Sequence, residues 1–417
     1  MNAAPVSTPP TAGGLDGLGE IRASASVPLP RLRSIPDFVG MPGDQSLADE
    51  SAFLAAQGAA LGWLAVCAIV GLVFGGGLAA RLSWPYAIVL FALFVGLPAY
   101  LNAFRYVALL LADPPGLTVV RPTTPVTVVV SGSAAPVSTL STLAYLAAQD
   151  YDGPIRVVLV GGGLADEDVV AVQQAARQYH LDLHVMRAGW LGAAEVANLA
   201  LTLVDTPLLL VLQPGACLHP SAVRLLAARL ESGPVDTAAV SGRAFVRNRR
   251  DGTASEILAA DYAIEVAATQ QVESLFRGAR VASATCTMYQ VQALRAVNGL
   301  PAVEAPEVAV AESFLARGWR VSHEPRAIAF TTEPVTLGTV GWARARATRG
   351  VSDGVRASGG VDGQRPRSGR FLVTLARSAP LRDAGFVFAG VHAAVLVLLG
   401  NLTLVAGYLV LVEHLSL

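Results

Sequence analysis

The sequence of 417 residues is apolar and poor in charge: hydrophobic residues make up 53% of it and charged residues only 15%, against about 25% charged residues in an average soluble domain. This combination is typical of a membrane protein or of a heavily buried α/β protein, and the two descriptions fit different parts of the chain. The formal net charge of −1 gives no reason to expect a nucleic-acid partner. The three cysteines lie far apart without metal-ligand spacing, so neither a metal site nor a disulfide framework is expected from them.

The amino-terminal region is expected to hold a disordered cytosolic tail followed by a helical hairpin in the membrane. Residues 1–58 are rich in proline, alanine, serine and glycine, which is typical of a segment without a packed core. The uncharged apolar runs 59–80 and 83–104 are each long enough to cross a bilayer, which takes about 20 helical residues. Because almost no linker separates them, the sequence predicts a transmembrane hairpin over 59–112.

A third apolar run, 384–412, predicts one further membrane helix after the central part of the chain. The stretch 344–382 before it is rich in arginine and poor in acidic residues. Positive flanks remain in the cytosol, so we expect a multi-pass protein of the plasma membrane with a cytosolic central domain. The basic linker and interfacial segment 351–383 would also suit anionic lipid, although a topology signal with a solvated linker explains the same charges.

Residues 120–350, between the hairpin and the third apolar run, have the pattern of an α/β domain. Short apolar strands alternate with segments of helical periodicity, which predicts a mostly parallel sheet with helices on both faces. The predicted strands are 125–130, 155–160, 181–186 and 207–212, and the predicted helices between them are 138–149, 167–179 and 193–204. Ligands bind such sheets beyond the carboxyl ends of the strands, so the loop after each of these strands is where a site is expected.

The loop after the second predicted strand does not fit a dinucleotide-binding site. It consists of glycines 161–163, but the third glycine of the dinucleotide fingerprint would have to stand where the chain has Asp166. The next helix opens with the carboxylates 166–168, which stabilise the helix N-terminus themselves and repel a phosphate. A glycine turn and a capped helix are therefore expected here.

Four short segments of the central domain together resemble one known family. They are Asp150-Tyr151 with Pro154, Gly192 with Asn198, residues 286–299 (CTMYQVQALRAVNG) and residues 315–321 (LARGWRV). In this order, and with apolar runs on both sides, they resemble the membrane-bound family 2 glycosyltransferases, the group that includes cellulose, hyaluronan and ceramide glucosyl synthases. The resemblance implies a GT-A-like α/β fold, a nucleotide-sugar donor and a divalent cation held by carboxylates.

The residues that this family uses for chemistry are missing from most of the matching positions. Gly161 stands where the resemblance implies an aspartate pair, and Gln213 and Gly215 stand where it implies a DxD pair. These three are donor-binding candidates by position, as are Arg344 and Arg346, which lie where the family has its Q-x-x-R-W element. No metal site is predicted, because one neutral glutamine oxygen is a poor ligand for a hard cation.

Glu307 is the one candidate left for a catalytic acid or base at a matching position. It also stands at the start of the predicted helix 308–317, where a carboxylate stabilises the helix dipole. We prefer this structural interpretation.

Other polar groups have both a functional and a structural interpretation. A basic cluster that would suit a diphosphate or lipid headgroups is formed by Arg243, Arg247, Arg249 and Arg250. The Asp251-Gly252 turn that follows favours a solvated loop. His219 follows the missing DxD pair and could meet a ligand, but with Pro220 it is more typical of a turn before the predicted helix 222–230.

Two functions are compatible with these residues. In the first, the chain is a non-catalytic partner or regulator in envelope polysaccharide or glycolipid synthesis, with no cofactor. Its contacts would then be an active glycosyltransferase or other membrane protein, and anionic lipid near 344–382. In the second, it is an active nucleotide-sugar-dependent enzyme with a rebuilt site, in which Glu307 is the base and arginines neutralise the diphosphate, with or without Mg2+ or Mn2+. We prefer the first, because several chemical positions are lost together while the strand pattern persists.

Overall fold

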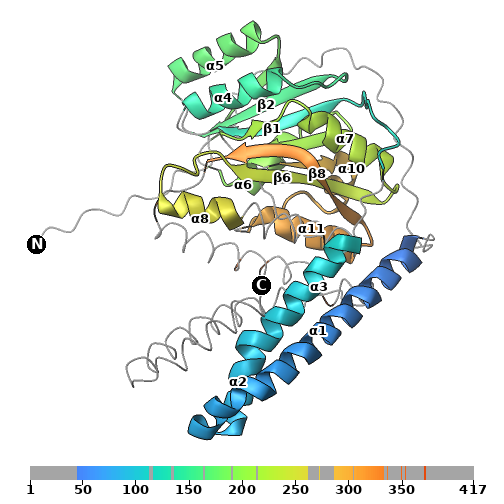
Figure 1. Ribbon diagram of the computed structural model, residues 1–417. Helices are drawn as coiled ribbons and strands as arrows, with labels where there is room; N and C mark the ends of the chain where they lie inside the picture. Colours follow the sequence, from blue (N-terminus) through green and yellow to red (C-terminus); the bar gives the residue numbers. More distant parts are fainter. Residues whose placement is uncertain are drawn as a thin grey trace, which may run out of the picture.

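The computed structural model describes residues 45–111, 116–132, 136–162, 165–188, 191–212, 215–261, 286–303 and 305–332, together with Val272, Thr336, Arg349, Asp353 and Phe371. A layered α/β domain lies at one end of a long helical hairpin (Figure 1). Arg344, Arg346, Gln213 and the predicted third membrane helix at 384–412 lie outside the described residues.

The hairpin consists of two long helical arms. The first arm is α1 (Gln45–Leu82). The second begins after Ser83, whose positive φ of 103° breaks the helix, and runs through α2 (Trp84–Phe91), the π-helical turn η1 (Ala92–Gly96) and α3 (Leu97–Leu111). α1 and α3 pack side by side (Figure 1). Because α1 begins at Gln45, residues 45–58 are helical, and the tail predicted over 1–58 extends too far toward the hairpin.

The two arms are held together near the sheet domain by an aromatic cluster. Phe53 of α1 and Phe104 of α3 make an edge-to-face contact with ring centroids 5.8 Å apart. Phe371 packs against both rings, at 5.7 Å and 5.3 Å, and Val272 is buried in the same cluster. Val272, which lies between α8 and β7 in sequence, and Phe371, which follows β8, therefore both pack at this end of the hairpin.

One described helix is long and apolar enough to cross a membrane. The segment Ser51–Leu72 within α1 has a mean hydropathy of 2.0, and only 17% of it is buried inside the protein. α3 is apolar but shorter. The first of the three predicted membrane helices is thus matched by a helix of sufficient length, and the other two remain predictions.

The sheet domain is built on eight strands in the order β3-β2-β1-β4-β7-β6-β8-β5. Their bounds are β1 Val126–Gly132, β2 Ile155–Gly162, β3 Asp182–Ala188, β4 Leu208–Leu212, β5 Cys217–Leu218, β6 Thr237–Val246, β7 Thr287–Gln290 and β8 Arg320–Thr331. β1 to β4 are parallel, β7 inserts antiparallel beside β4, and β6 and β8 are parallel to each other. The sheet is therefore mixed but mostly parallel, as predicted.

Helices cover both faces of the sheet, because successive strand residues point to opposite sides. Val128 and Leu210 belong to a core under α4 (Pro136–Ala147), α5 (Asp166–Gln178) and α7 (Ala222–Ser232). Val129 and Leu209 belong to a core over α6 (Ala193–Leu201), α10 (Val291–Ala296) and α11 (Pro306–Ala316). α8 (Thr253–Asp261) packs on the end of β6. Figure 1 places α11 on the side of the sheet that faces the hairpin. The four predicted strands and the helices of this domain are confirmed, with ends that differ by a few residues.

Candidate functional site

The carboxyl ends of the parallel strands form one edge of the sheet, where a ligand site is expected. The strand register places Gly132 of β1 beside Gly161 of β2, and Gly161 beside Arg187 of β3. On the other side of β1, Val130 pairs with Leu212, the last residue of β4. Two glycines thus line the middle of the edge, and the residues that flank them carry no carboxylate.

The loop after β4 packs against the start of α4. Gly215 has a φ of +79°, a conformation that favours glycine, and a Cβ at this position would lie 3.5 Å from Cβ of Ser138. Ser138 is in the first turn of α4, which contains no acidic residue. The amino end of a helix whose dipole no carboxylate offsets therefore borders the loop in which Gly215 lies.

Strands β6 and β8 extend past this edge and form a wall beside it. Ser241 of β6 and Val211 of β4 both pair with Thr287 of β7, so they are at the same level of the sheet. β4 ends one residue later, whereas β6 continues to Val246. The basic cluster 243–250 therefore begins beyond the end of β4.

Arg247 connects this wall to the loop after β4. Its backbone N–H donates to the carbonyl of Thr331 at the end of β8, at 2.8 Å. Its guanidinium donates to Sγ of Cys217, at 3.2 Å. Burial is the main reason that the pKa of the Cys217 thiol is raised, so the sulfur is a neutral acceptor and does not compensate the charge of Arg247. Only Ala216 separates Cys217 from Gly215 in sequence, so the guanidinium lies close to the candidate donor loop.

Arg243, the arginine of the cluster that lies within β6, packs against an aromatic ring. Cζ of Arg243 lies 4.8 Å from the centroid of the Phe245 ring. Phe245 in turn lies beside Phe330 of β8, with ring centroids 6.2 Å apart. Stacking of this kind stabilises a guanidinium without removing its charge.

The first turn of α5 is organised by its own carboxylates, as predicted. Asp166 forms an ion pair with Arg187 at 2.6 Å. Asp168 accepts a hydrogen bond from the backbone N–H of Ala165 at 3.3 Å, which caps the helix. The sequence analysis pointed to the loop after the third strand but did not single out Arg187. Gly161 and Arg187 are neighbours across β2 and β3, and their separation in sequence does not indicate this.

Glu307 lies in the first turn of α11, on the hairpin-facing side of the sheet. Burial first, and then the negative charge of Glu307, raise the pKa of Tyr289. The position of Glu307 at the amino end of α11 fits the helix-dipole interpretation.

Several residues that carry the family resemblance have structural roles. The side-chain amide of Asn198 bonds both the carbonyl and the N–H of Leu300, each at 2.8 Å, and so ties α6 to the turn after α10. Gly299 in that turn has a φ of +80°, and a Cβ there would lie 2.3 Å from Oδ1 of Asn198. Tyr151 donates its hydroxyl to the carbonyl of Thr124.

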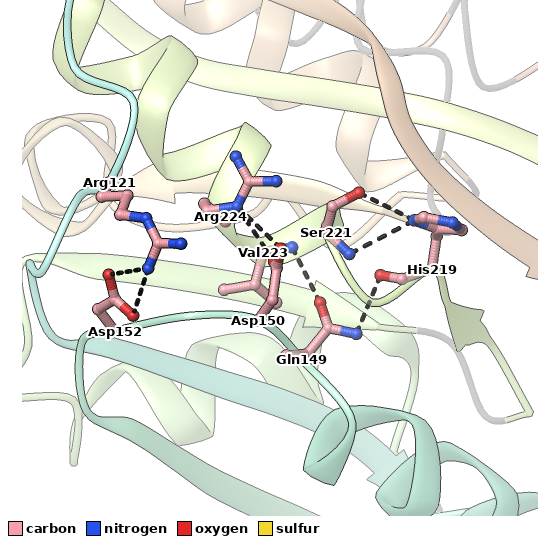
Figure 2. Close-up of polar contacts among 8 residues, drawn as sticks. All are labelled: Arg121, Gln149, Asp150, Asp152, His219, Ser221, Val223 and Arg224. Atoms are coloured by element: carbon pink, nitrogen blue, oxygen red, sulfur yellow. Dashed lines mark hydrogen bonds and ion pairs between the residues drawn. The ribbon is translucent and has the colours of Figure 1, made fainter.

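The opposite, amino-end edge of the sheet holds a network of polar contacts (Figure 2). Asp150 accepts two hydrogen bonds of 3.1 Å from Nε of Arg224. Gln149 donates to the carbonyl of His219 at 3.0 Å and accepts from the N–H of Val223 at 3.1 Å. His219 therefore belongs to the connection between β5 and α7, and the expected turn before a helix is confirmed there.

A buried charged network lies between α7 and β8. Glu324 is fully buried and binds Arg229 at 2.8 Å and Arg326 at 2.8 Å. Burial alone would raise the pKa of Glu324, but the two arginines outweigh it and hold the pKa below its ordinary value. The neighbouring His323, whose Nδ1 lies 3.2 Å from Oγ of Ser241, has its pKa lowered to about 4, chiefly by burial.

At the carboxyl-end edge, the carboxylates Asp166 and Asp168 are engaged by Arg187 and by the cap of α5, and the other side chains described above are cationic or neutral. Within the described ranges, no three His, Cys, Asp or Glu side chains lie close enough together to share a metal ion. Arg247 and the amino end of α4 are suited to an anion.

Known proteins of similar structure are glycosyltransferases. A mannosyltransferase from Pyrobaculum calidifontis, solved with GDP-Man and Mn2+, matches with a TM-score of 0.59 at 19% identity, over 79% of this chain and 95% of that one. TarS from S. aureus, solved with UDP, matches with a TM-score of 0.40 at 15% identity over 55% of this chain and 65% of that one.

A curated relative is also a glycosyltransferase. An N-acetylglucosaminyltransferase from Rhizobium leguminosarum bv. viciae is 24% identical over 220 residues, which is 48% of this chain and 50% of that protein. The chain therefore spans about half the length of the curated relative that it matches. No family model matches the chain. The class defined by fold is thus glycosyltransferase-like, and the particular activity has to be argued from the residues of this chain.

Proposed function

We propose that this chain is a membrane-anchored, non-catalytic relative of the family 2 glycosyltransferases that acts as a partner or regulator of an active enzyme in envelope polysaccharide or glycolipid synthesis. The observation that carries the proposal is the residue content of the carboxyl-end edge. β2 ends in Gly161-Gly162, and the loop after β4 reads Gln213-Pro214-Gly215. A metal-dependent transferase needs carboxylates there to hold the cation that neutralises the leaving diphosphate.

The position of Glu307 supports the same proposal. It begins α11, a helix that is buried on almost all sides, with Phe314 and even Glu312 fully buried. The preceding Pro306 sets the first helical turn. These features suit a residue retained for helix stability.

The hairpin supports a membrane anchor. Leucines and isoleucines on its outer surface are exposed: Leu61, Ile69, Leu72, Ile88 and Leu110. Exposed apolar surface of this extent on adjacent helices is stable in contact with lipid and unstable in water. The arm from Trp84 to Leu111 is helical throughout, which would allow a second span.

The positive flank argues for a cytosolic sheet domain and for anionic lipid as a contact near 344–382. Phe371, within this stretch, packs on Phe53 and Phe104 at the end of the hairpin nearest the sheet domain. Arginines next to it in sequence would lie near the membrane surface, where anionic headgroups attract them.

The proposal is tested with the purified full chain in detergent. UDP-N-acetylglucosamine and GDP-mannose would be supplied with Mn2+ or Mg2+, and release of the nucleoside diphosphate would be followed. We expect no release above a sample without protein. In cells, the Glu307→Gln variant is expected to restore the phenotype of a deletion strain as well as the unaltered chain does. Metal-dependent release that Glu307→Gln abolishes would overturn the proposal.

An active enzyme with a rebuilt site is the second candidate, and Arg247 is the observation that favours it. A guanidinium beside the donor loop can supply part of the electrostatic stabilisation that a cation normally gives. Release of nucleoside diphosphate in the presence of EDTA, lost in Arg247→Gln, would support this second function in place of the first.

A further inference from the structure

The arginines of the sheet domain differ in what balances their charge. Seven of the described ones form an ion pair with a carboxylate: Arg121, Arg156, Arg187, Arg224, Arg229, Arg320 and Arg326. In the part of the chain that the structure describes, Arg247, Arg249 and Arg250 make no ion pair. All three are exposed and follow one another within a single turn after β6. Like charges this close repel one another, so their clustering indicates a function other than stability.

The position of Arg247 shows what this group faces. The strand register puts β6 past the end of β4, so the group overhangs the carboxyl-end edge. The contact with Cys217 at 3.2 Å brings the Arg247 guanidinium to the segment that follows Gly215. A thiol is a weak acceptor, so an anion that reached the guanidinium would form much stronger hydrogen bonds with it.

A second source of positive potential borders the same loop. α4 has twelve residues, its first turn has no acidic residue, and Ser138 in that turn lies beside Gly215. The contrast with α5 is direct, because its first turn carries Asp166, Glu167 and Asp168. Of the two helices that begin at this edge after β1 and β2, α4 alone favours an anion.

We infer that Arg247, assisted by Arg249, Arg250 and the amino end of α4, forms a metal-independent site for a phosphate-bearing ligand, with the diphosphate of a nucleotide as its preferred occupant. The arginines take the electrostatic place of the cation that the missing carboxylates cannot hold. The inference rests on the proposed function only through the fold, since binding is expected whether or not the chain turns a donor over. A non-catalytic chain with this site would respond to the nucleotide supply of the enzyme that it accompanies.

Calorimetry on the full chain in a neutral detergent, with EDTA, tests the inference. The ligands are inorganic pyrophosphate, UDP, GDP and a short-chain, water-soluble phosphatidylglycerol. We expect wild-type protein to bind pyrophosphate and at least one nucleotide without metal. Arg247→Gln is expected to weaken binding about tenfold, the usual effect of one charge-assisted hydrogen bond. Arg247→Lys should recover part of the loss, since it keeps the charge but not the fork.

Two control variants separate binding from packing. Arg177 is exposed on α5 and remote from the edge, so Arg177→Gln should bind like wild type although it removes the same charge. Cys217→Ala removes the thiol contact of Arg247 but keeps the guanidinium, and should also retain binding. Equal losses in Arg247→Gln and Cys217→Ala would mean that Arg247 only packs against Cys217, and would overturn the site.

The remaining outcomes are decisive in the same way. Binding that appears only with Mn2+, or no binding of any of the four ligands to folded wild-type protein, would overturn the inference. Binding of phosphatidylglycerol alone, lost in Arg247→Gln, would support the site and assign it to a lipid headgroup. Donor turnover by the wild type would overturn the non-catalytic role and leave this site standing, so the two proposals can fail separately.

Discussion

The two edges of the sheet use their charges in opposite ways. At the amino-end edge, arginines and carboxylates of different elements are paired: Arg121 with Asp152, Arg156 with Asp182 and Asp205, Arg224 with Asp150, and Arg320 with Asp236. At the carboxyl-end edge, Arg187 is also paired, with Asp166, but glycines 132 and 161 stand at the centre and Arg247 contacts a neutral thiol. The arginines described at the amino-end edge therefore all have carboxylate partners, whereas Arg247 at the carboxyl-end edge has none among the described residues.

The paired charges of the amino-end edge stabilise the fold, whereas we propose that Arg247 binds a ligand. The segments around Asp150 and Asn198, which resemble motifs of the family 2 glycosyltransferases, each connect elements of the fold. Where that resemblance implies carboxylates, the chain has Gly161, Gln213 and Gly215. The proposed non-catalytic role would require the first set of residues and not the second. Substitutions on either side of this division can confirm it or break it.

The largest effect is expected from the buried pair between α7 and β8. Glu324→Ala leaves Arg229 buried without its carboxylate and should cost about 3–5 kcal/mol in the free energy of unfolding. Asp152→Ala breaks the exposed pair with Arg121, whose side chains are 44% and 75% exposed, and should cost less than about 1 kcal/mol. Urea unfolding of the full chain in detergent, followed by tryptophan fluorescence, measures both. Similar costs would mean that burial does not set the strength of pairing in this domain.

The next effect is a pH dependence from His323. Its pKa of about 4 in the folded protein lies below the ordinary value of 6.5, so the unfolded chain binds the proton first as pH falls. Stability should therefore be lost between about pH 6.5 and 4, by up to about 3 kcal/mol. His323→Gln removes the titrating group, and the difference between the two pH profiles isolates it from the carboxylates. Parallel profiles over this range would show that His323 is protonated as readily in the folded state.

The sequence predicted the parallel half of the sheet well and the antiparallel half poorly. β1, β2 and β4 are short apolar runs buried on both faces, so composition alone marks them, and β3 is a half-buried strand at the end of the sheet. β6 contains Gly242 and small residues, and it pairs with β8, which is distant in sequence. Such pairing is set by long-range packing, which local periodicity does not contain.

The sequence predicted the edge of the sheet at which a site is expected, but not the side chains that border it. β1, β2 and β4 do end at one edge, because they are parallel. The contact between Arg247 and Cys217 depends on how far β6 extends beyond β4. The sequence does not indicate how far β6 extends beyond β4, so the basic cluster was interpreted as a solvated loop.

A smaller effect on the free energy of unfolding is expected where Asn198 connects α6 to the turn after α10. Gly299→Ala would place a Cβ 2.3 Å from Oδ1 of Asn198 at a φ of +80° and should destabilise the chain by about 2 kcal/mol. Gly116→Ala is the matched control, because nothing lies within 4 Å of its Cβ position. If the clash matters, the cost of Gly299→Ala should fall in an Asn198→Ala background. An unchanged cost would assign the whole effect to the backbone.

The smallest effect is the most direct comparison of the two edges. Asp150→Ala removes the carboxylate that faces Arg224, a pair whose side chains are 51% and 22% exposed, and should cost about 0.5–1 kcal/mol. Arg247→Ala removes a charge that has no carboxylate partner among the described residues, so the free energy of unfolding should stay within about 0.5 kcal/mol of wild type. At low salt the stability should rise, because the repulsion between Arg247 and its arginine neighbours is relieved. Thermal unfolding of both variants in low and high salt tests this contrast. A clear loss of stability in Arg247→Ala that exceeds that of Asp150→Ala would place the arginine with the structural residues, and the carboxyl-end edge would then be as complete as the opposite one.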